Sequence, residues 1–280
     1  MSMSLETVLL LFIVTSISAV VNLLIASVSA ISRRYFRFSL EISTLSAILP
    51  ALSAVSAVFA AVCAALFAKS FELLSQSAED NIAYERVVDA LQVLTNSCIN
   101  ICEGQALDMA FEDTFNVTKD EYMNMIYKKT GDLITASTTI GAIMGGASSN
   151  EIQALRTYGK QIGLAFQIQD DYIDLTGDES IGKPVGSDLV EGKKTLMVVY
   201  ALEKANKEDH DRLVELLEAN DESIIPEAME ILEKYGAINY ARSKAYDCVI
   251  ESKQALSILP DSDAKDALFK LADFVFTRKS

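Results

Sequence analysis

The chain has 280 residues, half of them apolar, and its 39 acidic and 24 basic side chains give a formal net charge of −15. Such an acidic protein repels nucleic acid, so we expect no nucleic-acid partner. It can still bind phosphate groups, because divalent metal ions bridge carboxylates to phosphate oxygens. Four cysteines without a CxxC pair, and a single histidine, argue against a zinc site and a disulfide framework.

The N-terminal quarter of the chain contains two uncharged stretches, residues 7–32 and 42–68. Each is long enough to span a bilayer, so one interpretation is a membrane hairpin with membrane contact through residues 7–68. Both stretches are rich in Ser and Ala rather than Leu and Phe, which favours buried core helices instead. The two interpretations stay open.

A basic cluster, Arg33, Arg34 and Arg37, separates the two stretches. The positive-inside rule would place this cluster in the cytoplasm and the acidic remainder of the chain outside, away from cytosolic metabolites. We therefore treat residues 1–65 as an atypical apolar segment, either a membrane hairpin or a stretch translated in the wrong frame. For the protein itself we expect a cytoplasmic location.

The remainder of the chain, residues 66–280, has helical periodicity throughout and no alternation typical of strands. Turn-forming segments divide it into an expected six or seven helices. These breaks lie at residues 116–119, 145–150, 177–186, 220–226 and 259–263. We predict one all-α domain, an antiparallel helical bundle around a central cavity.

Residues 121–144 place a cation on an apolar helix face. Lys129 shares its stripe with Leu133, Ala136, Ile140 and Met144 at helical spacing. One interpretation is that Lys129 extends its amine to solvent. The other is that Lys129 points into the central cavity, with Thr130 beside it as a hydroxyl donor.

The helix predicted over residues 151–175 ends in a cluster of carboxylates. Its apolar stripe is made of Ile152, Leu155, Ile162, Phe166 and Ile173. Asp170 and Asp174 lie one turn apart at the edge of this stripe, with Gln167 between them in angle, whereas Asp171 stands about 100° away.

Carboxylates that face a bundle interior need a neutralising partner. An Asp-Asp-x-x-Asp pattern suits Mg²⁺, which prefers one or two carboxylates together with phosphate oxygens, so a diphosphate is the expected ligand. The alternative is a solvated helix end before Gly177, although acidic groups at a helix C-terminus oppose its dipole.

The segment after this helix combines glycine and lysine. Glycines at positions 177, 182, 186 and 192 alternate with Lys183, Lys193 and Lys194. Such a backbone can approach an anion closely. Its position directly after the aspartates indicates a diphosphate site.

These residues resemble a known family. The sequence FQIQDDYIDLTGDESIGKPVGSDLVEGKKT is similar to the second aspartate-rich motif and following loop of the trans-polyprenyl synthases, which include farnesyl and geranylgeranyl diphosphate synthases. Shorter similarities cover LFAKSFELL from residue 66, CEGQ from residue 102 with Asp108, YKKTG from residue 127, and the tail from Tyr235 to Lys279. The resemblance implies the all-α isoprenoid synthase fold and usually a homodimer.

The resemblance also implies a reaction and a set of site residues. An allylic diphosphate would ionise in the presence of Mg²⁺ to an allylic cation and diphosphate. The double bond of isopentenyl diphosphate would attack this cation, and a proton would then be lost. Metal ligands would be Asp170, Asp171 and Asp174. Lys129 and Lys183 would be catalytic, because they stabilise the departing diphosphate. The substrate-binding residues would be Thr130, Gln167, Asp188 and Lys193.

The chain departs from the family in its first quarter. The first aspartate-rich motif would fall near residues 33–42, which read RRYFRFSLEI, and the position of a family aspartate holds Ala64. The segment that binds isopentenyl diphosphate is also missing. A protein of this literal sequence should ionise its substrate poorly, and a frame shift or misplaced start would explain residues 1–65.

Three alternatives follow from this departure. The chain could be a catalytically impaired or non-catalytic subunit that serves a complete synthase. It could be a membrane-anchored homologue whose hairpin is real. A terpene cyclase has a similar metal chemistry but would lack the GKPVGSD and EGKKT loop, so it ranks last.

Overall fold

A computed structural model describes residues 64–78, 82–112, 114–177, 185–219 and 221–278. Within these ranges the chain is helical and contains no strand, which confirms the predicted all-α class. The helices are 64–76, α3 (Tyr84–Glu112), α4 (Lys119–Ile126), α5 (Asp132–Met144), α6 (Ser149–Thr176), α7 (Ser187–Val190), α8 (Leu196–Lys204), α9 (Lys207–Ala219), α10 (Ile225–Lys234), α11 (Ala237–Ala255) and α12 (Asp263–Thr277). Three shorter turns are the π-helix η1 (Tyr127–Gly131) and the 3₁₀-helices η3 (Glu222–Ile224) and η4 (Leu256–Ile258).

The atypical N-terminal segment falls almost wholly outside the described residues, which begin at residue 64. The predicted membrane hairpin or wrong-frame stretch therefore stays a prediction, as does the boundary between residues 65 and 66. Among the helices that the structure describes, none is long and apolar enough to cross a membrane.

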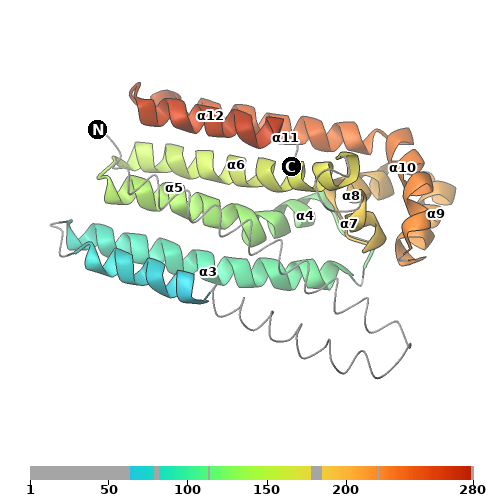
Figure 1. Ribbon diagram of the computed structural model, residues 1–280, viewed down its shortest axis with the longest axis horizontal. Coiled ribbons are helices and arrows are strands. Elements are labelled where there is room, and N and C mark those ends of the chain that lie inside the picture. Colours follow the sequence, from blue (N-terminus) through green and yellow to red (C-terminus); the bar gives the residue numbers. More distant parts are fainter. Residues whose placement is uncertain (1–63, 79–81, 113, 178–184, 220, 279–280) are drawn as a thin grey trace.

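The long helices lie lengthwise beside one another, in the order α3, α5, α6 and then α11 with α12 (Figure 1). The chain reverses direction between successive long helices (Figure 1), and the connection from α6 to α11 is a long one that contains α7 to α10. Helix α6 lies in the middle, in contact with α5 on one side and with α11 and α12 on the other. This arrangement confirms the predicted antiparallel bundle, whereas its central cavity stays a prediction.

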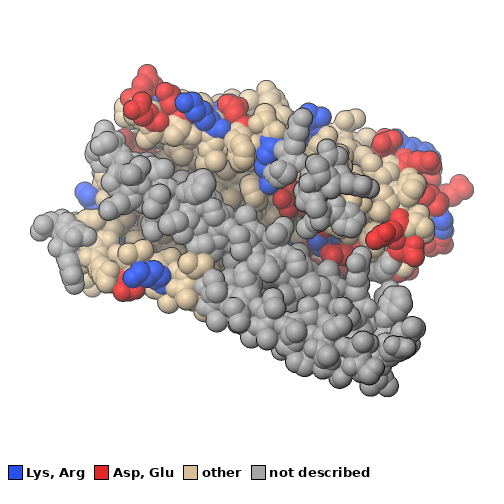
Figure 2. All heavy atoms as spheres, viewed as in Figure 1, with Lys and Arg blue, Asp and Glu red and all other residues tan. Residues whose placement is uncertain are grey.

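The short helices α7 to α10 gather at one end of the bundle, where α6 ends (Figure 1). Acidic side chains are prominent over the α9 and α10 end in Figure 2. There the guanidinium of Arg212 donates to both oxygens of Glu227, at 2.6 and 2.7 Å. Both side chains are nearly half exposed, so this ion pair lies on the solvated surface.

Local sequence sets where the site-bearing helices begin. Ser148 caps α6, because its hydroxyl accepts from the Glu151 amide while the Glu151 carboxylate accepts from the Ser148 amide. Thr118 and Glu121 form the same reciprocal cap before α4. Such caps satisfy amides that a helix start leaves unpaired.

All five predicted breaks are confirmed, but the expected six or seven helices were too few. The described residues contain ten α-helices from α3 to α12. Additional turns occur at residues 191–195, 205–206 and 235–236. Gly192 and Gly236 adopt left-handed backbone conformations with φ of 69° and 68°, which divide stretches that hydrophobic periodicity alone reads as continuous.

The predicted apolar stripe of α6 faces the core, but it is only part of the packed surface of this helix. Ile152, Leu155 and Phe166 are half-buried against the core clusters. Of Ile152, Leu155, Ile162, Phe166 and Ile173, only Ile162 is buried. Because α5, α11 and α12 all contact α6, its buried arc is much wider than one stripe. A single hydrophobic stripe is therefore a poor guide to the side chains of this central helix.

Glycines bring η1 into backbone contact with its neighbours. A Cβ atom at Gly163 of α6 would lie 2.4 Å from the Gly131 Cα atom. A Cβ atom at Gly104 of α3 would lie 2.3 Å from the Lys129 amide nitrogen. The turn that carries Lys129 and Thr130 is thus held directly between two long helices.

We predict that Gly163→Ala lowers the free energy of unfolding by about 1–3 kcal/mol, because its methyl group meets backbone that must move. Alanine favours a helix over glycine by up to about 1 kcal/mol, which opposes this loss. Gly131→Ala is the matched control, since its Cβ meets a Tyr127 side-chain carbon at 3.1 Å. Denaturant unfolding should show a smaller loss for the control. A Gly163→Ala protein as stable as the wild type would contradict the prediction.

Candidate active site

Asp171 is the most deeply buried of the three aspartates on α6, with 8% of its surface exposed. Its Oδ2 atom accepts a hydrogen bond from the Tyr122 hydroxyl at 2.6 Å, and its Oδ1 atom accepts from Gln167 Nε2 at 2.9 Å. Burial and the nearby Asp188 carboxylate raise the pKa of Asp171 to about 8. The two donors partly offset this effect.

A chain of hydrogen bonds extends from Asp171 to η1. The fully buried Thr130 donates its hydroxyl to Gln167 Oε1 at 2.9 Å. Gln167 then donates to Asp171, so its amide orientation is set by both neighbours. The predicted site residues Thr130, Gln167 and Asp171 are therefore brought together.

Asp174, one turn further along α6, is bound to the start of α7. Its Oδ1 atom accepts from the Ser187 hydroxyl at 2.5 Å and its Oδ2 atom from the Asp188 amide at 2.9 Å. The Gly186 amide donates to the Asp174 backbone carbonyl at 2.7 Å. Gly186 itself adopts a left-handed backbone conformation, with φ of 78°. Burial and the Asp188 carboxylate raise the pKa of Asp174 to about 6.

Asp188 and Lys193 form an ion pair beside these aspartates. The Lys193 amine also lies 3.2 Å from the Glu191 carboxylate. The two predicted residues therefore lie together next to Asp174, since Asp188 donates its amide to Asp174.

Asp170 differs from its neighbours, because 55% of its side chain is exposed. Its Oδ1 atom accepts from Arg278 at 3.1 Å. The same guanidinium donates to the Phe166 carbonyl at 3.1 Å and lies 4.1 Å from the centroid of the Phe166 ring. The end of α12 is thus joined to the aspartate motif.

Lys129 is paired with a residue of α3. Its amine lies 2.7 Å from Asp108 Oδ2, and only 17% of its side chain is exposed. The interpretation that Lys129 extends to solvent is therefore wrong, since the amine forms a largely buried ion pair. Its predicted direction toward the aspartates stays a prediction.

The burial of the three aspartates differs from the prediction. The helical wheel placed Asp170 and Asp174 inward and Asp171 aside, but Asp171 is buried and Asp170 is exposed. The reason is that α6 is contacted by α5, α11 and α12, so side chains on more than one of its faces are buried. Lys183 falls within residues 178–184, outside the described part of the chain, so its role stays a prediction.

Sequence reasoning missed three residues that contact the aspartates. Tyr122 lies 49 residues before its partner Asp171, and Arg278 lies 108 residues after Asp170. Ser187 is closer in sequence to Asp174, but nothing in the glycine-rich loop distinguishes its hydroxyl as a donor to that carboxylate. Spacing within one helix gives no signal for such contacts.

The carboxylates suit a divalent cation that binds together with another ligand. In the described part of the chain, no three Asp, Glu, His or Cys side chains are grouped as a metal site on their own. Asp171 and Asp174 nevertheless have raised pKa values through burial and the charge of Asp188. A cation would relieve this repulsion, and Mg²⁺ ordinarily completes its coordination with phosphate oxygens and water.

Comparison with known proteins gives consistent matches. A model of the family described as Polyprenyl synthetase matches residues 51–233. The short chain isoprenyl diphosphate synthase of Methanothermobacter thermautotrophicus is 54% identical over 215 residues, which cover 76% of this chain and 65% of that protein. The chain spans 64 to 65% of the length of the curated isoprenyl and geranylgeranyl diphosphate synthases it matches.

Solved structures agree with this result. The geranylgeranyl pyrophosphate synthetase of Pyrococcus horikoshii has a TM-score of 0.79 at 34% identity, with 98% of this chain and 80% of that chain covered. The polyprenyl synthase of Caulobacter crescentus, complexed with calcium and isoprenyl diphosphate, has a TM-score of 0.71 at 30% identity, with 80% and 67% covered. The chain therefore belongs to the polyprenyl synthetase family.

Proposed function

We propose that the protein is a prenyltransferase that condenses isopentenyl diphosphate with an allylic diphosphate. The main support is the aspartate motif at the end of α6, where hydrogen bonds link Asp171 to Gln167 and Gln167 to Thr130. Support also comes from the family and from a relative whose structure contains calcium with isoprenyl diphosphate. Such a pairing of metal and diphosphate is the chemistry that these carboxylates favour.

In this proposal Asp170, Asp171 and Asp174 hold Mg²⁺. When bound, the cation neutralises the charge that develops on the departing diphosphate. Gln167 orients the Asp171 carboxylate through one hydrogen bond, and Ser187 with the Asp188 amide orients Asp174. Geometry set before the reaction avoids reorganisation during bond cleavage.

Other predicted residues contact the substrate directly or support those that do. Lys129 and Lys183 bind the departing diphosphate and stabilise it through their positive charges. Thr130 and Gln167 contribute polar contacts to the same group. Asp188 and Lys193 form an ion pair that supports Asp174 and contributes to substrate binding.

The location of the protein and its N-terminal segment are parts of the same proposal. We place the enzyme in the cytoplasm. Residues 66–280 carry the helical domain, and any membrane contact is made through residues 7–68. Because the first aspartate-rich motif is missing, we expect the protein to turn over slowly.

We also propose a homodimer, supported by the outer face of α3. Tyr84, Val88, Ile99, Cys102 and Met109 lie on one face at helical spacing, and all five are exposed. A long uncharged stripe on a surface helix is typical of an interface rather than of a solvated face. A second copy of the chain would cover it.

The activity is tested by incubating the purified protein with radiolabelled isopentenyl diphosphate, an allylic diphosphate and Mg²⁺, followed by chromatography. We expect elongated product, and Asp174→Asn should reduce its rate about 100-fold or more through loss of an electrostatic contact to the metal. Asp261→Asn is the control, because the Asp261 side chain is fully exposed and contacts only Lys265 among the described residues.

Two results would count against this activity. Equal rates for Asp174→Asn and Asp261→Asn would show that Asp174 takes no part in the reaction. Absence of product, from folded protein that still binds a metal–diphosphate complex, would identify a non-catalytic subunit.

The homodimer is tested by light scattering coupled to size-exclusion chromatography. We predict that Ile99→Lys combined with Met109→Lys converts a dimer into a monomer, because two lysines from each subunit would be buried at the interface. Phe274→Lys is the control, since Phe274 of α12 is equally exposed, at 60%, but lies away from the stripe. A monomeric wild-type protein would contradict the proposal.

A further inference from the structure

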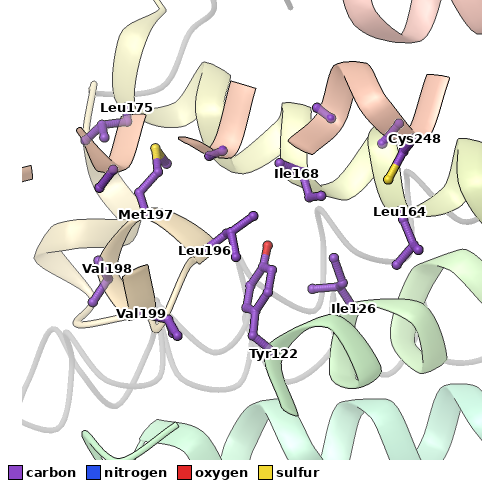
Figure 3. Close-up of a cluster of buried hydrophobic side chains, with 14 of the residues drawn as sticks. Tyr122, Ile126, Leu164, Ile168, Leu175, Leu196, Met197, Val198, Val199 and Cys248 are labelled. Atoms are coloured by element: carbon purple, nitrogen blue, oxygen red, sulfur yellow. The ribbon is translucent and has the colours of Figure 1, made fainter. Parts of the chain in front are cut away.

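Tyr122 of α4 links the apolar core to the aspartate motif. The residue is 1% exposed, and its hydroxyl lies 2.6 Å from Asp171 Oδ2. Figure 3 shows its ring with Leu196 and Ile126 on either side and its hydroxyl oxygen directed away from α4. The ring is therefore held by packing, while its single polar atom reaches the carboxylate.

The two oxygens of Asp171 are bound by donors from different helices. Tyr122 of α4 donates to Oδ2, and Gln167 of α6 donates to Oδ1. With one donor on each oxygen, the carboxylate plane has little freedom to rotate. The two hydrogen bonds, at 2.6 and 2.9 Å, come from two separate helices, so this orientation is well defined.

The position of the tyrosine is itself well supported. The reciprocal cap of Thr118 and Glu121 sets the start of α4, one turn before the ring. Helix α4 also contacts α8, whose buried residues Leu196 and Val198 belong to the same core cluster. Tyr122 therefore presents its hydroxyl from a rigid part of the bundle.

We propose that Tyr122 is a positioning residue, which orients Asp171 so that its remaining lone pairs face the bound divalent cation. This inference rests on the proposed function, in which Asp171 binds the metal. Partners that orient a metal-binding carboxylate typically change metal affinity by about 10- to 100-fold. The competing explanation is that Tyr122 merely satisfies a buried carboxylate and leaves metal binding unaffected.

The two explanations are separated by direct measurement of metal binding. Mn²⁺ replaces Mg²⁺ in the presence of inorganic diphosphate, and free Mn²⁺ is followed by electron paramagnetic resonance. We expect Tyr122→Phe to weaken Mn²⁺ affinity about 10- to 100-fold. The double variant Tyr122→Phe with Asp171→Asn should bind no more weakly than Asp171→Asn alone, because the tyrosine acts through Asp171.

Tyr158→Phe is the matched control. Tyr158 is also 1% exposed, and its hydroxyl donates one hydrogen bond, to the Leu268 carbonyl at 2.9 Å. It lies on α6 about 20 Å from Asp171, at 1.5 Å per helical residue. Both variants lose a buried hydroxyl and should be destabilised alike in thermal unfolding, but only Tyr122→Phe should lose Mn²⁺ affinity.

Equal Mn²⁺ affinity in wild type and Tyr122→Phe would overturn the inference and leave the proposed function intact. Absence of Mn²⁺ binding by the wild type would overturn both. Should Tyr122→Phe not fold, isotope-edited infrared spectroscopy of the ring-labelled wild type gives the answer. A tyrosine C–O band that shifts when Mg²⁺ and diphosphate are added, but stays unchanged in Asp171→Asn, supports the inference, and an unchanged wild-type band refutes it.

Discussion

The arrangement of the site depends on direct backbone contact between η1 and its two neighbouring helices. Without side chains at Gly104 and Gly163, α3 and α6 approach to distances at which a Cβ atom would overlap the η1 backbone. Lys129 can therefore reach Asp108 on α3 while the next residue, Thr130, reaches Gln167 on α6. A π-helical turn at this point has one more residue than an α-helical turn, and such turns frequently accompany functional sites.

Charge is the second constraint. Asp171, Asp174 and Asp188 lie close enough that the charge of Asp188 raises the pKa of both other groups. Hydrogen bonds from the neutral hydroxyls of Tyr122 and Ser187 stabilise Asp171 and Asp174, and the Lys193 amine pairs with Asp188. These contacts hold the carboxylates in place without fully neutralising them, an arrangement that suits a site built to take up a metal ion.

Much of this could be predicted from sequence, because the informative features are local. The breaks and the Asp-Asp-x-x-Asp pattern each depend on residues within one or two helical turns, and the helices of the structure end and begin at the predicted breaks. The burial of Asp171 was missed because one helical wheel assumes one buried face, whereas α6 is contacted from several sides. Tyr122 and Arg278 were missed because tertiary packing alone brings them to α6, from far along the chain.

The hydrogen bonds of Asp174 give the site an unexpected property. One carboxylate holds the start of α7 through Ser187 and Asp188, and in the proposed function it also binds the metal. The order of α7 and the occupancy of the metal site are then two equilibria that share one group, and thermodynamic linkage makes their influence mutual. Amide exchange in α7 would report metal occupancy, and a partner that orders α7 would change metal affinity without touching the metal.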